Sequence, residues 1–422
     1  MERVGSALLK TKDKNIMGKG KSISYTEAVE KITAAAKVVE TENTELAACS
    51  RRILAQDVIA ADNVPQFDRS PYDGYAFKAA DVANACEEKP VTLKVVDYIP
   101  AGEVSHCPVT DGTAVRLMTG APIPEGADCV TMYEATEWTD EEVKIFKPSK
   151  VGDNIVYAGE DIKKGQVLAR EGTVIDPGLL GTLASQGISR PLVYKKLKVG
   201  LISTGSELQS VEEELRPGMI HDSNQYTFTA ALDKLGFEAV RYGIAADTVE
   251  GIGAAINKAL FECDAIILTG GVSVGDFDLT PAAMERSGAE ILFRGVGLKP
   301  GMSCAFGVKD GKLICGLSGN PASSLTTFYV VAVPGLKKMA GIAEYNYKEI
   351  TVTLAGDFNK KSRGTRVLRG KLDLSDGTAK LQISKDQGNV VLSSSIGCDC
   401  MAFIPAGSGP QPAGTKLKGF LI

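Results

Sequence analysis

Histidine and tryptophan are nearly absent from this chain, which has 2 histidines and 1 tryptophan among 422 residues. His106 and His221 are too few for a multi-histidine metal centre, and they disfavour a Ser-His-Asp hydrolase. The 9 cysteines are an odd number and form no CxxC pair, since Cys398 and Cys400 make only a CxC. The sequence therefore disfavours both a disulfide framework and a structural zinc site.

Long apolar runs and an excess of basic charge are also missing. Residues 1–22 contain no apolar core of signal-peptide length. The apolar run at 323–333 is too short to cross a bilayer and stops at Pro334. A formal net charge of −5 and a pI of about 5.4 give no general attraction to nucleic acid or anionic membranes. We expect a cytoplasmic protein that binds neither.

The sequence pattern changes along the chain, whose length predicts about two to four domains. Residues 22–60 are expected to be helical with Ser24 as N-cap, and 90–150 carry short β-rich runs. From 190 to about 330, strands and helices alternate, which predicts a parallel sheet covered by helices on both faces. After Gly341 the pattern is β only, which predicts a small all-β C-terminal domain.

Three strands of the expected sheet end in small polar turns, in "GLISTGSEL", "IILTGGVSVGDFD" and "LICGLSGNPASS". In open parallel sheets, ligands bind where the carboxyl ends of the strands meet. Glycine lets backbone amides approach an anion, and a helix N-terminus attracts negative charge. The candidate contacts for a phosphorylated ligand are Ser203, Thr204, Gly205, Gly270, Gly271, Ser273, Gly275, Ser318, Gly319, Asn320 and Pro321.

Acidic residues beside these turns are candidate ligands of a divalent cation, because Mg²⁺ is often shared between one or two carboxylates and phosphate oxygens. The candidates are Glu207, Asp247, Asp276 and Asp278. Each turn alone also fits a tight turn or a helix start, and Asp278 also fits an N-cap of the helix expected from Leu279. Three such ends on one sheet favour a ligand site.

A second group of polar residues lies outside the expected sheet. In "RSPYDGYAF" the carboxylate of Asp73 stands among aromatic residues that suit a flat heterocycle, although a β-turn with buried tyrosines fits equally. "RLMTGAPIPEGAD" offers Arg116 and Thr119 for oxyanion contacts, or is a proline-rich turn. "AGEDI" offers Asp161, or an exposed acidic pair without function.

Taken together, the chain closely resembles the MoeA family of molybdopterin molybdenumtransferases, which includes the gephyrin and plant Cnx E-domains. The matching stretches are "SPYDGYAF", "RLMTGAPIPEGADCV", "AGEDI", "STGSEL", "DSNQY", "LTGGVSVGDFD", "LKPG" and "GLSGNPASS". Each stretch is weak evidence alone, but together they follow the family order. The resemblance spans roughly residues 25–420, nearly the whole chain.

The resemblance implies an α/β multidomain fold. It places a linker-like domain in two segments, 1–60 and 151–189, around a β-rich inserted domain at 61–150. A MogA-like α/β domain with the parallel sheet follows at 190–342, and a C-terminal β-barrel at 343–422. Family members form elongated homodimers with the active site at the dimer interface.

The resemblance also assigns site residues. Asp73, Thr119 and Asp161 match the side of the site that faces the partner subunit. Glu207, Asp247 and Asp278 match the family's acidic residues, as catalytic and metal-binding groups. Asp222 falls in the Asp-Ser-Asn motif, and Lys299 and Pro300 match the oxyanion-binding Lys-Pro pair. The matches to the family's further molybdate contacts are Arg369, Ser393 and Ser394.

The implied activity is molybdenum insertion. Family members take adenylyl-molybdopterin and molybdate, insert the metal into the dithiolene and release AMP, with Mg²⁺ assisting cleavage of the adenylyl phosphate. A MogA-type adenylyltransferase is the implied protein partner. Two alternatives remain open: a MogA-type adenylyltransferase that uses ATP, and a non-catalytic scaffold that binds a partner helix as the gephyrin E-domain does. The extra β-rich domains argue against the first, and the acidic and Lys-Pro motifs against the second.

Two departures from the family pattern concern cations. The family usually has Lys-Pro-Gly-Lys-Pro, whereas this chain has Lys-Pro-Gly-Met-Ser, so that Met302 replaces a lysine. A second common lysine corresponds to Gly295. Because a charge-assisted hydrogen bond contributes roughly 1.5–3 kcal/mol, their loss weakens attraction to anions. We therefore hypothesise a variant that takes tungstate in place of molybdate or binds the oxyanion more weakly.

Overall fold

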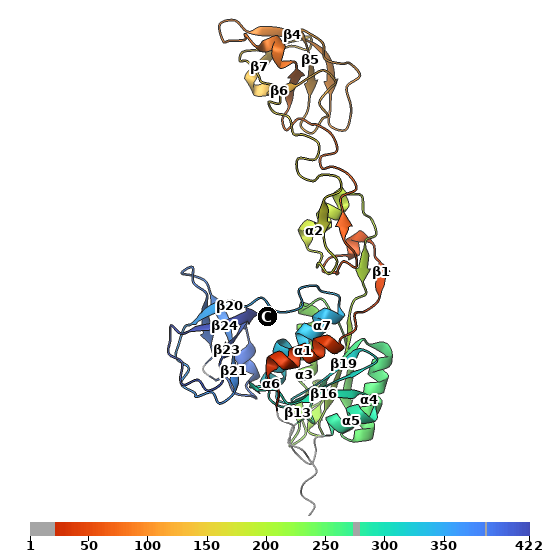
Figure 1. Cartoon of the computed structure of the whole chain (residues 1–422), viewed down its shortest axis with the longest axis vertical. Helices are drawn as coiled ribbons and strands as arrows, with labels where there is room; N and C mark the ends of the chain where they lie inside the picture. The colour runs from red at the N-terminus through yellow and green to blue at the C-terminus, as the bar shows by residue number, and fades with distance from the viewer. Residues whose placement is uncertain (1–21, 273–278, 385) are drawn as a thin grey trace, which may run out of the picture.

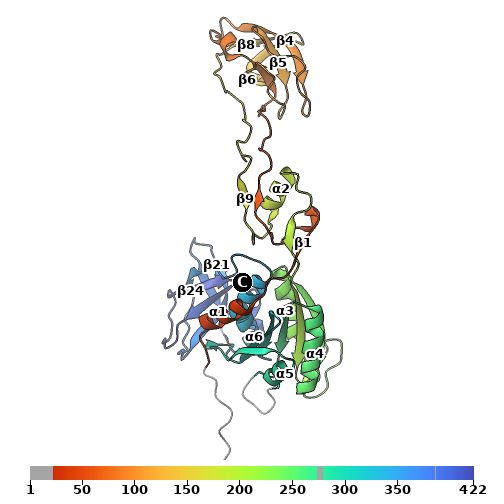
Figure 2. The ribbon, with the colours of Figure 1, turned by 45° about the vertical axis from the view of Figure 1, so that its right-hand side comes forward.

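A computed structural model describes residues 22–272, 279–384 and 386–422. Figures 1 and 2 show an elongated molecule with an α/β body and a barrel side by side at one end. A small part around α2 (Pro177–Ser185) lies in the middle, and a β-rich part lies at the other end. Within the described ranges, no helix has both the length and the apolar character needed to span a membrane.

The α/β body is built on a sheet with strand order β14-β11-β15-β19-β18-β16. The strands are β11 (Lys198–Thr204), β14 (Glu238–Ala245), β15 (Ala265–Thr269), β16 (Glu290–Arg294), β18 (Cys304–Lys309) and β19 (Lys312–Leu317). The strands β14, β11, β15 and β19 are parallel as expected, but β18 is antiparallel to both neighbours. The cause is a hairpin turn in which Asp310 and Gly311 have φ angles of 54° and 80°, as is typical of Asp-Gly.

Helices cover both faces of this sheet because its strands are apolar on both sides. The helices are α1 (Tyr25–Ala35), α3 (Asn224–Lys234), α4 (Val249–Glu262), α5 (Thr280–Arg286), α6 (Pro321–Thr327) and α7 (Val333–Met339). In β11, Leu201 packs with Phe228 of α3, whereas Ile202 on the opposite face packs with Ile252 of α4. Alternate residues of one strand thus belong to two separate cores.

The expectation that residues 22–60 are helical is wrong beyond α1. Ser24 caps this helix as predicted, accepting a hydrogen bond from the backbone of Glu27, but the helix ends at Ala35. The chain then extends, since the backbone amide of Lys37 donates to Gly311 and that of Val39 to Met339. Hydrogen bonds to the α/β body therefore replace the helical ones.

Short strands form both the middle part, around α2, and the β-rich part at the far end, which we call the upper part (Figure 1). In the middle part, β1 (Thr41–Asn43) pairs with β10 (Leu192–Tyr194), and β2 (Val58–Ile59) pairs with β9 (Val167–Ala169). The upper part is a sheet of order β6-β3-β5-β4-β8-β7. Its strands are β3 (Gly74–Phe77), β4 (Val91–Ile99), β5 (Thr113–Leu117), β6 (Cys129–Met132), β7 (Thr136–Trp138) and β8 (Glu142–Ile145).

The C-terminal strands close into a barrel, because the order β21-β22-β20-β24-β23 is completed by pairing of β23 with β21. The strands are β20 (Ile350–Leu354), β21 (Thr365–Asp373), β22 (Lys380–Ile383), β23 (Cys400–Ile404) and β24 (Lys416–Leu421). The short strand β17 (Leu298–Lys299) of the preceding body joins β21. The α/β sheet, the β-rich inserted part and the barrel confirm the predicted fold class.

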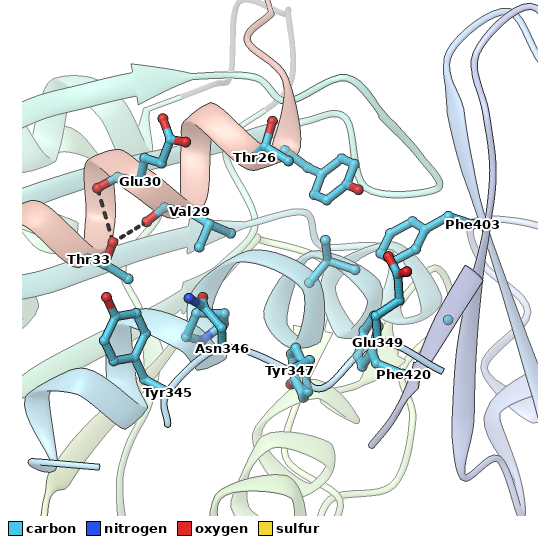
Figure 3. A pocket seen from close by; sticks show the side chains of 14 residues that line it. Thr26, Val29, Glu30, Thr33, Tyr345, Asn346, Tyr347, Glu349, Phe403 and Phe420 are labelled. Atoms are coloured by element: carbon cyan, nitrogen blue, oxygen red, sulfur yellow. Dashed lines mark hydrogen bonds between the residues drawn. The ribbon is translucent and has the colours of Figure 1, made fainter. Parts of the chain in front are cut away.

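An aromatic seam joins α1 to the barrel. The ring of Tyr25 stacks on Phe403 with centroids 4.9 Å apart, and that of Tyr347 stacks on Phe420 at 4.0 Å. A cavity of about 360 Å³ lies along this seam, with Glu30 of α1 on one side and barrel rings on the other (Figure 3). None of the predicted site residues lines it. The seam holds the barrel beside the α/β body.

Candidate active site

The three predicted loops meet at one edge of the α/β sheet. In the parallel ladder, Ser203 of β11 is level with Thr269 of β15, which is level with Leu317 of β19. The carboxyl ends of the three strands therefore lie side by side, as the sequence pattern predicts. Ser203 and Thr204 are buried, and the hydroxyl groups of Ser203 and Thr269 lie 3.3 Å apart.

Glycine at 270 and 271 is required by the packing of these strand ends. Gly270 and Gly271 have φ angles of 104° and 61°, which favour glycine. A Cβ on Gly270 would lie 2.2 Å from the carbonyl oxygen of Thr204, and one on Gly271 would lie 2.8 Å from Oγ1 of Thr280. The Cβ side of both glycines is thus filled by Thr204 and Thr280 of the same chain, and their contact with a phosphorylated ligand stays a prediction.

A buried polar network links the strand ends to α3. The carboxylate of Asp222 accepts a 2.9 Å hydrogen bond from Nε2 of Gln225, which also donates to Oγ of Ser203 at 3.4 Å. The side chain of Asn224 donates to the carbonyl of Gly319, at the end of β19, at 2.9 Å. The Oδ1 atom of Asn224 is buried and has no partner in the described part of the chain. This network therefore offers one unused acceptor at the strand ends.

The start of α6 is only partly open. Asn320 is the exposed N-cap residue and Pro321 occupies the first turn, as the sequence predicts. The buried hydroxyl of Ser318 accepts from the backbone amide of Asn320 at 3.2 Å. The backbone amide of Ser323 donates to the carbonyl of Asn389 in the barrel, so part of this helix start is used by the protein itself.

Two predicted metal ligands follow adjacent strands. Glu207 is exposed in the turn between β11 and β12 (Leu208–Gln209), and its carboxylate lies against Gly205, whose φ is 141°. Asp247 is half-buried between β14 and α4. Two carboxylates at neighbouring strand ends suit a Mg²⁺ ion that also binds phosphate oxygens. Within the described residues, no group of three or more acidic, histidine or cysteine side chains could hold a metal ion.

Some predicted contacts lie outside the described residues. These are Ser273, Gly275, Asp276 and Asp278. Helix α5 begins at Thr280 with Leu279 as its N-cap residue, so its described start involves no side-chain cap.

The barrel supplies an arginine that no solvent reaches. Arg369 of β21 is 0% exposed, and its guanidinium donates to the hydroxyl of Ser394 at 2.8 Å and to that of Thr326 in α6 at 3.3 Å. Ser394 lies in the short helix η5 (Leu392–Ser395), where Ser393 is exposed. Burial lowers the pKa of Arg369 from its usual range, yet no carboxylate of the described residues forms an ion pair with it.

One polar atom of this arginine and one of η5 form no hydrogen bond in the described residues. Nε of Arg369 and Oγ of Ser395 are both buried without a hydrogen-bond partner in the described residues. A buried guanidinium without a counter-ion is costly unless an anion binds to it. The donor set of one arginine and serine hydroxyls matches the oxygens of a dianionic oxyanion. This junction between α6 and the barrel therefore has donors of the kind that bind an oxyanion.

Lys299 and Pro300 approach the same helix. Lys299 is exposed at the end of β17, level with Arg366 of β21, and Pro300 is buried behind a cis peptide bond. The next carbonyl, that of Gly301, accepts a 2.8 Å hydrogen bond from Thr327 of α6. The Lys-Pro segment and Arg369 thus contact adjacent residues of α6. We call the strand-end network and this junction together the lower half-site: Ser203, Asp222, Asn224, Gly319, Lys299 and Arg369.

The upper half-site, Asp73 and Thr119, lies in the β-rich part. The Oδ1 atom of Asp73 accepts 2.7 Å hydrogen bonds from both the backbone amide and the hydroxyl of Thr119. These bonds, aided by the charge of Arg116, hold the pKa of Asp73 below its usual range. Asp161 is exposed, and its backbone amide donates to Val64 at 3.1 Å. Figures 1 and 2 place this part at the opposite end of the molecule from the lower half-site.

The comparisons with known proteins cover nearly the whole chain. Residues 23–187 match the family model for the MoeA N-terminal region (domain I and II), and 200–338 match that for a probable molybdopterin binding domain. A molybdopterin molybdenumtransferase from Staphylococcus aureus strain Mu50 is 36% identical over 399 residues, 94% of this chain and 95% of that protein. One from Staphylococcus epidermidis strain RP62A has the same identity and coverage.

The chain belongs to the molybdopterin molybdenumtransferase family. It is a transferase of molybdenum cofactor biosynthesis. The crystal structure of the molybdopterin biosynthesis moeA protein from Pyrococcus horikoshii OT3 matches with a TM-score of 0.81 and 31% identity, over 95% of this chain and 100% of that one. The resemblance seen in the sequence motifs is thus confirmed.

Both departures from the molybdenumtransferase pattern fall in one turn. The backbone amide of Val296 donates to the carbonyl of Met302 at 3.0 Å, which closes the turn beside Gly295. Met302 is 56% exposed, and Gly295 has a φ of 76°, which a lysine would adopt only with strain. The two positions at which the resemblance implies lysines therefore lie at one turn, which also contains Lys299.

Sequence reasoning missed several residues that the structure places in this molybdenumtransferase. Thr326 and Gln387 contact Arg369 directly, but neither stands in a motif with a chemical signature. Asn224 stands in the quoted "DSNQY" stretch, from which only Asp222 was selected. The guanidinium of Arg116 lies 4.8–5.3 Å from the ring centroids of three aromatic residues, Tyr98, Tyr133 and Trp138. These residues are distant in sequence, so the cluster becomes visible only in the folded β-rich part.

Proposed function

We propose that this protein inserts molybdate into adenylyl-molybdopterin and releases AMP. The observation that carries the proposal is Arg369, a fully buried guanidinium with an unused Nε atom and no ion-pair partner among the described residues. Thr326 connects it to α6, whose first residues follow the strand-end loop of β19. In this proposal Arg369, Ser394 and Lys299 bind the oxyanion, while the strand-end loops bind the adenylylated pterin.

Mg²⁺ is part of the proposal, with Glu207, Asp247 and Asp278 as the side chains that would hold it. When bound, the ion would offset negative charge on the phosphate groups as the adenylyl bond breaks. The protein side chains contribute fixed charges and hydrogen bonds, and no covalent nucleophile is required. Removal of divalent cations should abolish AMP release and leave the binding of molybdate alone unchanged.

We further propose that the complete site forms between two copies of the chain. Asp73, Thr119 and Asp161 of one copy would face the strand ends and barrel of the other. The support is the separation of the upper and lower half-sites in one chain. The domain borders stated from the sequence, a cytoplasmic location and a MogA-type adenylyltransferase as the supplier of substrate belong to the same proposal.

The experiment is incubation of the purified protein with adenylyl-molybdopterin and either molybdate or tungstate, following AMP and protein-bound or pterin-bound metal. The proposal expects AMP and metal insertion in equal amounts. Formation of adenylyl-molybdopterin and pyrophosphate from ATP and unadenylated pterin, without turnover of adenylyl-molybdopterin, would instead indicate an adenylyltransferase. No turnover with either substrate would indicate a scaffold. Tungstate is the informative second oxyanion because the turn at Gly295 and Met302 lacks the two lysines that the resemblance implies. Equal affinity for molybdate and tungstate would remove the reason to propose a variant with altered oxyanion preference.

A further inference from the structure

The side chain of Gln387 bonds to the backbone of Arg369 at a position where a neighbouring β-strand would otherwise pair with it. In the barrel, β21 and β22 pair antiparallel as far as Gly370 opposite Ile383. The next pair would be Arg369 opposite Ser384, but β22 ends at Ile383. The backbone N–H and C=O of Arg369 therefore lose their partner strand on this edge, and both groups are buried.

The side-chain amide of Gln387 makes the two hydrogen bonds that a neighbouring strand would make with Arg369. Its Oε1 accepts from the backbone amide of Arg369 at 3.0 Å, and its Nε2 donates to the carbonyl of Arg369 at 3.0 Å. Nε2 also donates to the hydroxyl of Ser384 at 2.9 Å. Gln387 is 3% exposed, so these bonds form away from water. A primary amide is the side-chain group that offers both a donor and an acceptor in the geometry of a peptide.

The same loop also contacts the other end of the arginine. The carbonyl of Gly388, which follows Gln387, accepts from the guanidinium of Arg369 at 3.4 Å. On the opposite edge, β23 pairs with β21 and fixes Arg369 opposite Met401. The backbone and the guanidinium of Arg369 are thus both held by hydrogen bonds, while its buried Nε atom has no partner in the described residues.

We propose that Gln387 is a positioning residue: it fixes Arg369 so that the guanidinium is ready to bind the molybdate oxyanion. This inference rests on the proposed function of Arg369. A guanidinium that is already oriented loses less conformational entropy on binding an anion than a free one. Gln387 itself does not contact the anion and acts through Arg369.

The test compares Gln387→Met with Gln382→Met in the full-length protein, using molybdate alone as the titrant in calorimetry. Gln382 lies on the neighbouring strand β22, but it is exposed, and its side chain bonds only to Asp373 among the described residues. We expect molybdate to bind at least about tenfold more weakly to Gln387→Met, because both bonds to Arg369 are lost, and normally to Gln382→Met. In turnover, the KM for molybdate should rise while that for adenylyl-molybdopterin stays unchanged.

A double-variant cycle shows whether Gln387 acts through Arg369. Gln387→Met should add nothing to the loss caused by Arg369→Gln. Wild-type affinity of Gln387→Met, or a full additional loss in the double variant, would overturn the positioning role. Wild-type affinity of Arg369→Gln would instead overturn the proposed function. If Gln387→Met does not fold, Gln387→Glu decides, since it keeps the length and the acceptor but loses the donor, and it too should bind molybdate at least about tenfold more weakly.

Discussion

The two ends of this molecule hold an arginine each, and the two guanidinium groups are supported by opposite kinds of neighbours. Arg369 in the barrel is surrounded by hydroxyl and carbonyl oxygens from η5, α6 and the loop at Gly388. Arg116 in the β-rich part is surrounded by the rings of Tyr98, Tyr133 and Trp138. Neither arginine forms an ion pair within the described ranges.

The difference bears on what each arginine can do. Oxygen acceptors fix the direction of individual N–H groups, so Arg369 can present a chosen N–H to an anion. Aromatic faces attract the charge as a whole and leave the N–H directions free. Arg116 therefore adds positive charge near Asp73, whereas in the proposed function Arg369 recognises the shape of an oxyanion. In the proposed two-chain site, the lower half-site lies within one chain, and the upper half-site contributes the exposed carboxylate of Asp73 to the other chain.

The largest expected effect concerns the assembly of these halves from two chains. Asp73→Ala and Arg369→Gln homodimers should each lose at least about a hundredfold in AMP release, as removal of one charged or donor group commonly does. A purified hybrid with one subunit of each kind contains one intact site, so it should regain about half of the wild-type rate. A hybrid as inactive as both parents would show that the two halves do not combine across subunits.

The next effect tests the rigidity of the lower half-site. Gly270→Ala places a Cβ 2.2 Å from the carbonyl oxygen of Thr204 at a φ of 104°, so it should lower the free energy of unfolding by at least about 2 kcal/mol. Gly319→Ala is the matched control, because its Cβ would lie 3.6 Å from the nearest atom. Denaturant unfolding followed by circular dichroism measures both. Equal stabilities of the two variants would mean that the strand ends shift to accommodate the added Cβ atom.

A smaller effect separates the two arginines. Arg116→Met removes the charge from the three rings and should reduce stability by about 1.5–3 kcal/mol, since each such contact contributes about 0.5–1 kcal/mol. Trp138 is the only tryptophan of the chain, so its fluorescence reports this site alone. Molybdate binding should stay unchanged, whereas Arg369→Met should abolish it. Loss of molybdate binding in Arg116→Met would show that Arg116 also takes part in binding the oxyanion, contrary to this prediction.

The sequence predicted the parts of the site that depend on local pattern. Glycine turns after apolar strands located the edge of the α/β sheet at Ser203, Gly270 and Ser318. The β18–β19 hairpin was missed because two apolar strands were assigned to a parallel sheet without weighing the Asp-Gly turn between them. That turn, at Asp310 and Gly311, is a local signal that was available.

Other parts of the site depend on contacts between distant segments. Gln387 matters only because β22 ends at Ile383 and leaves Arg369 without a partner, which no local pattern indicates. The early end of α1 depends likewise on the hydrogen bond from Lys37 to Gly311, more than 200 residues away in sequence. Such residues have ordinary sequence surroundings, so only the assembled fold identifies them.

The smallest effect concerns the ionisation of Asp73. Two hydrogen bonds from Thr119 favour the carboxylate, so the pKa of Asp73 is lower in the folded than in the unfolded state. The resulting stabilisation is present above the unfolded-state pKa and is lost as the pH falls through the folded-state pKa. Thr119→Val removes the hydroxyl donor and keeps the backbone donor. The pKa of Asp73 should therefore rise toward its usual range, and the acid limb of AMP release should move to higher pH.

Carboxyl-carbon NMR titration measures this pKa directly, and Asp97 serves as an internal reference. Asp97 lies in the same β-rich part, and hydrogen bonds from Ser105 and His106 lower its pKa independently of Thr119. In Thr119→Val the Asp73 resonance should titrate at higher pH than in the wild type, while that of Asp97 stays in place. If both shift equally, the substitution has altered the whole β-rich part. If neither shifts, the backbone amide alone sets the ionisation of Asp73, and the upper half-site depends on loop geometry more than on the threonine side chain.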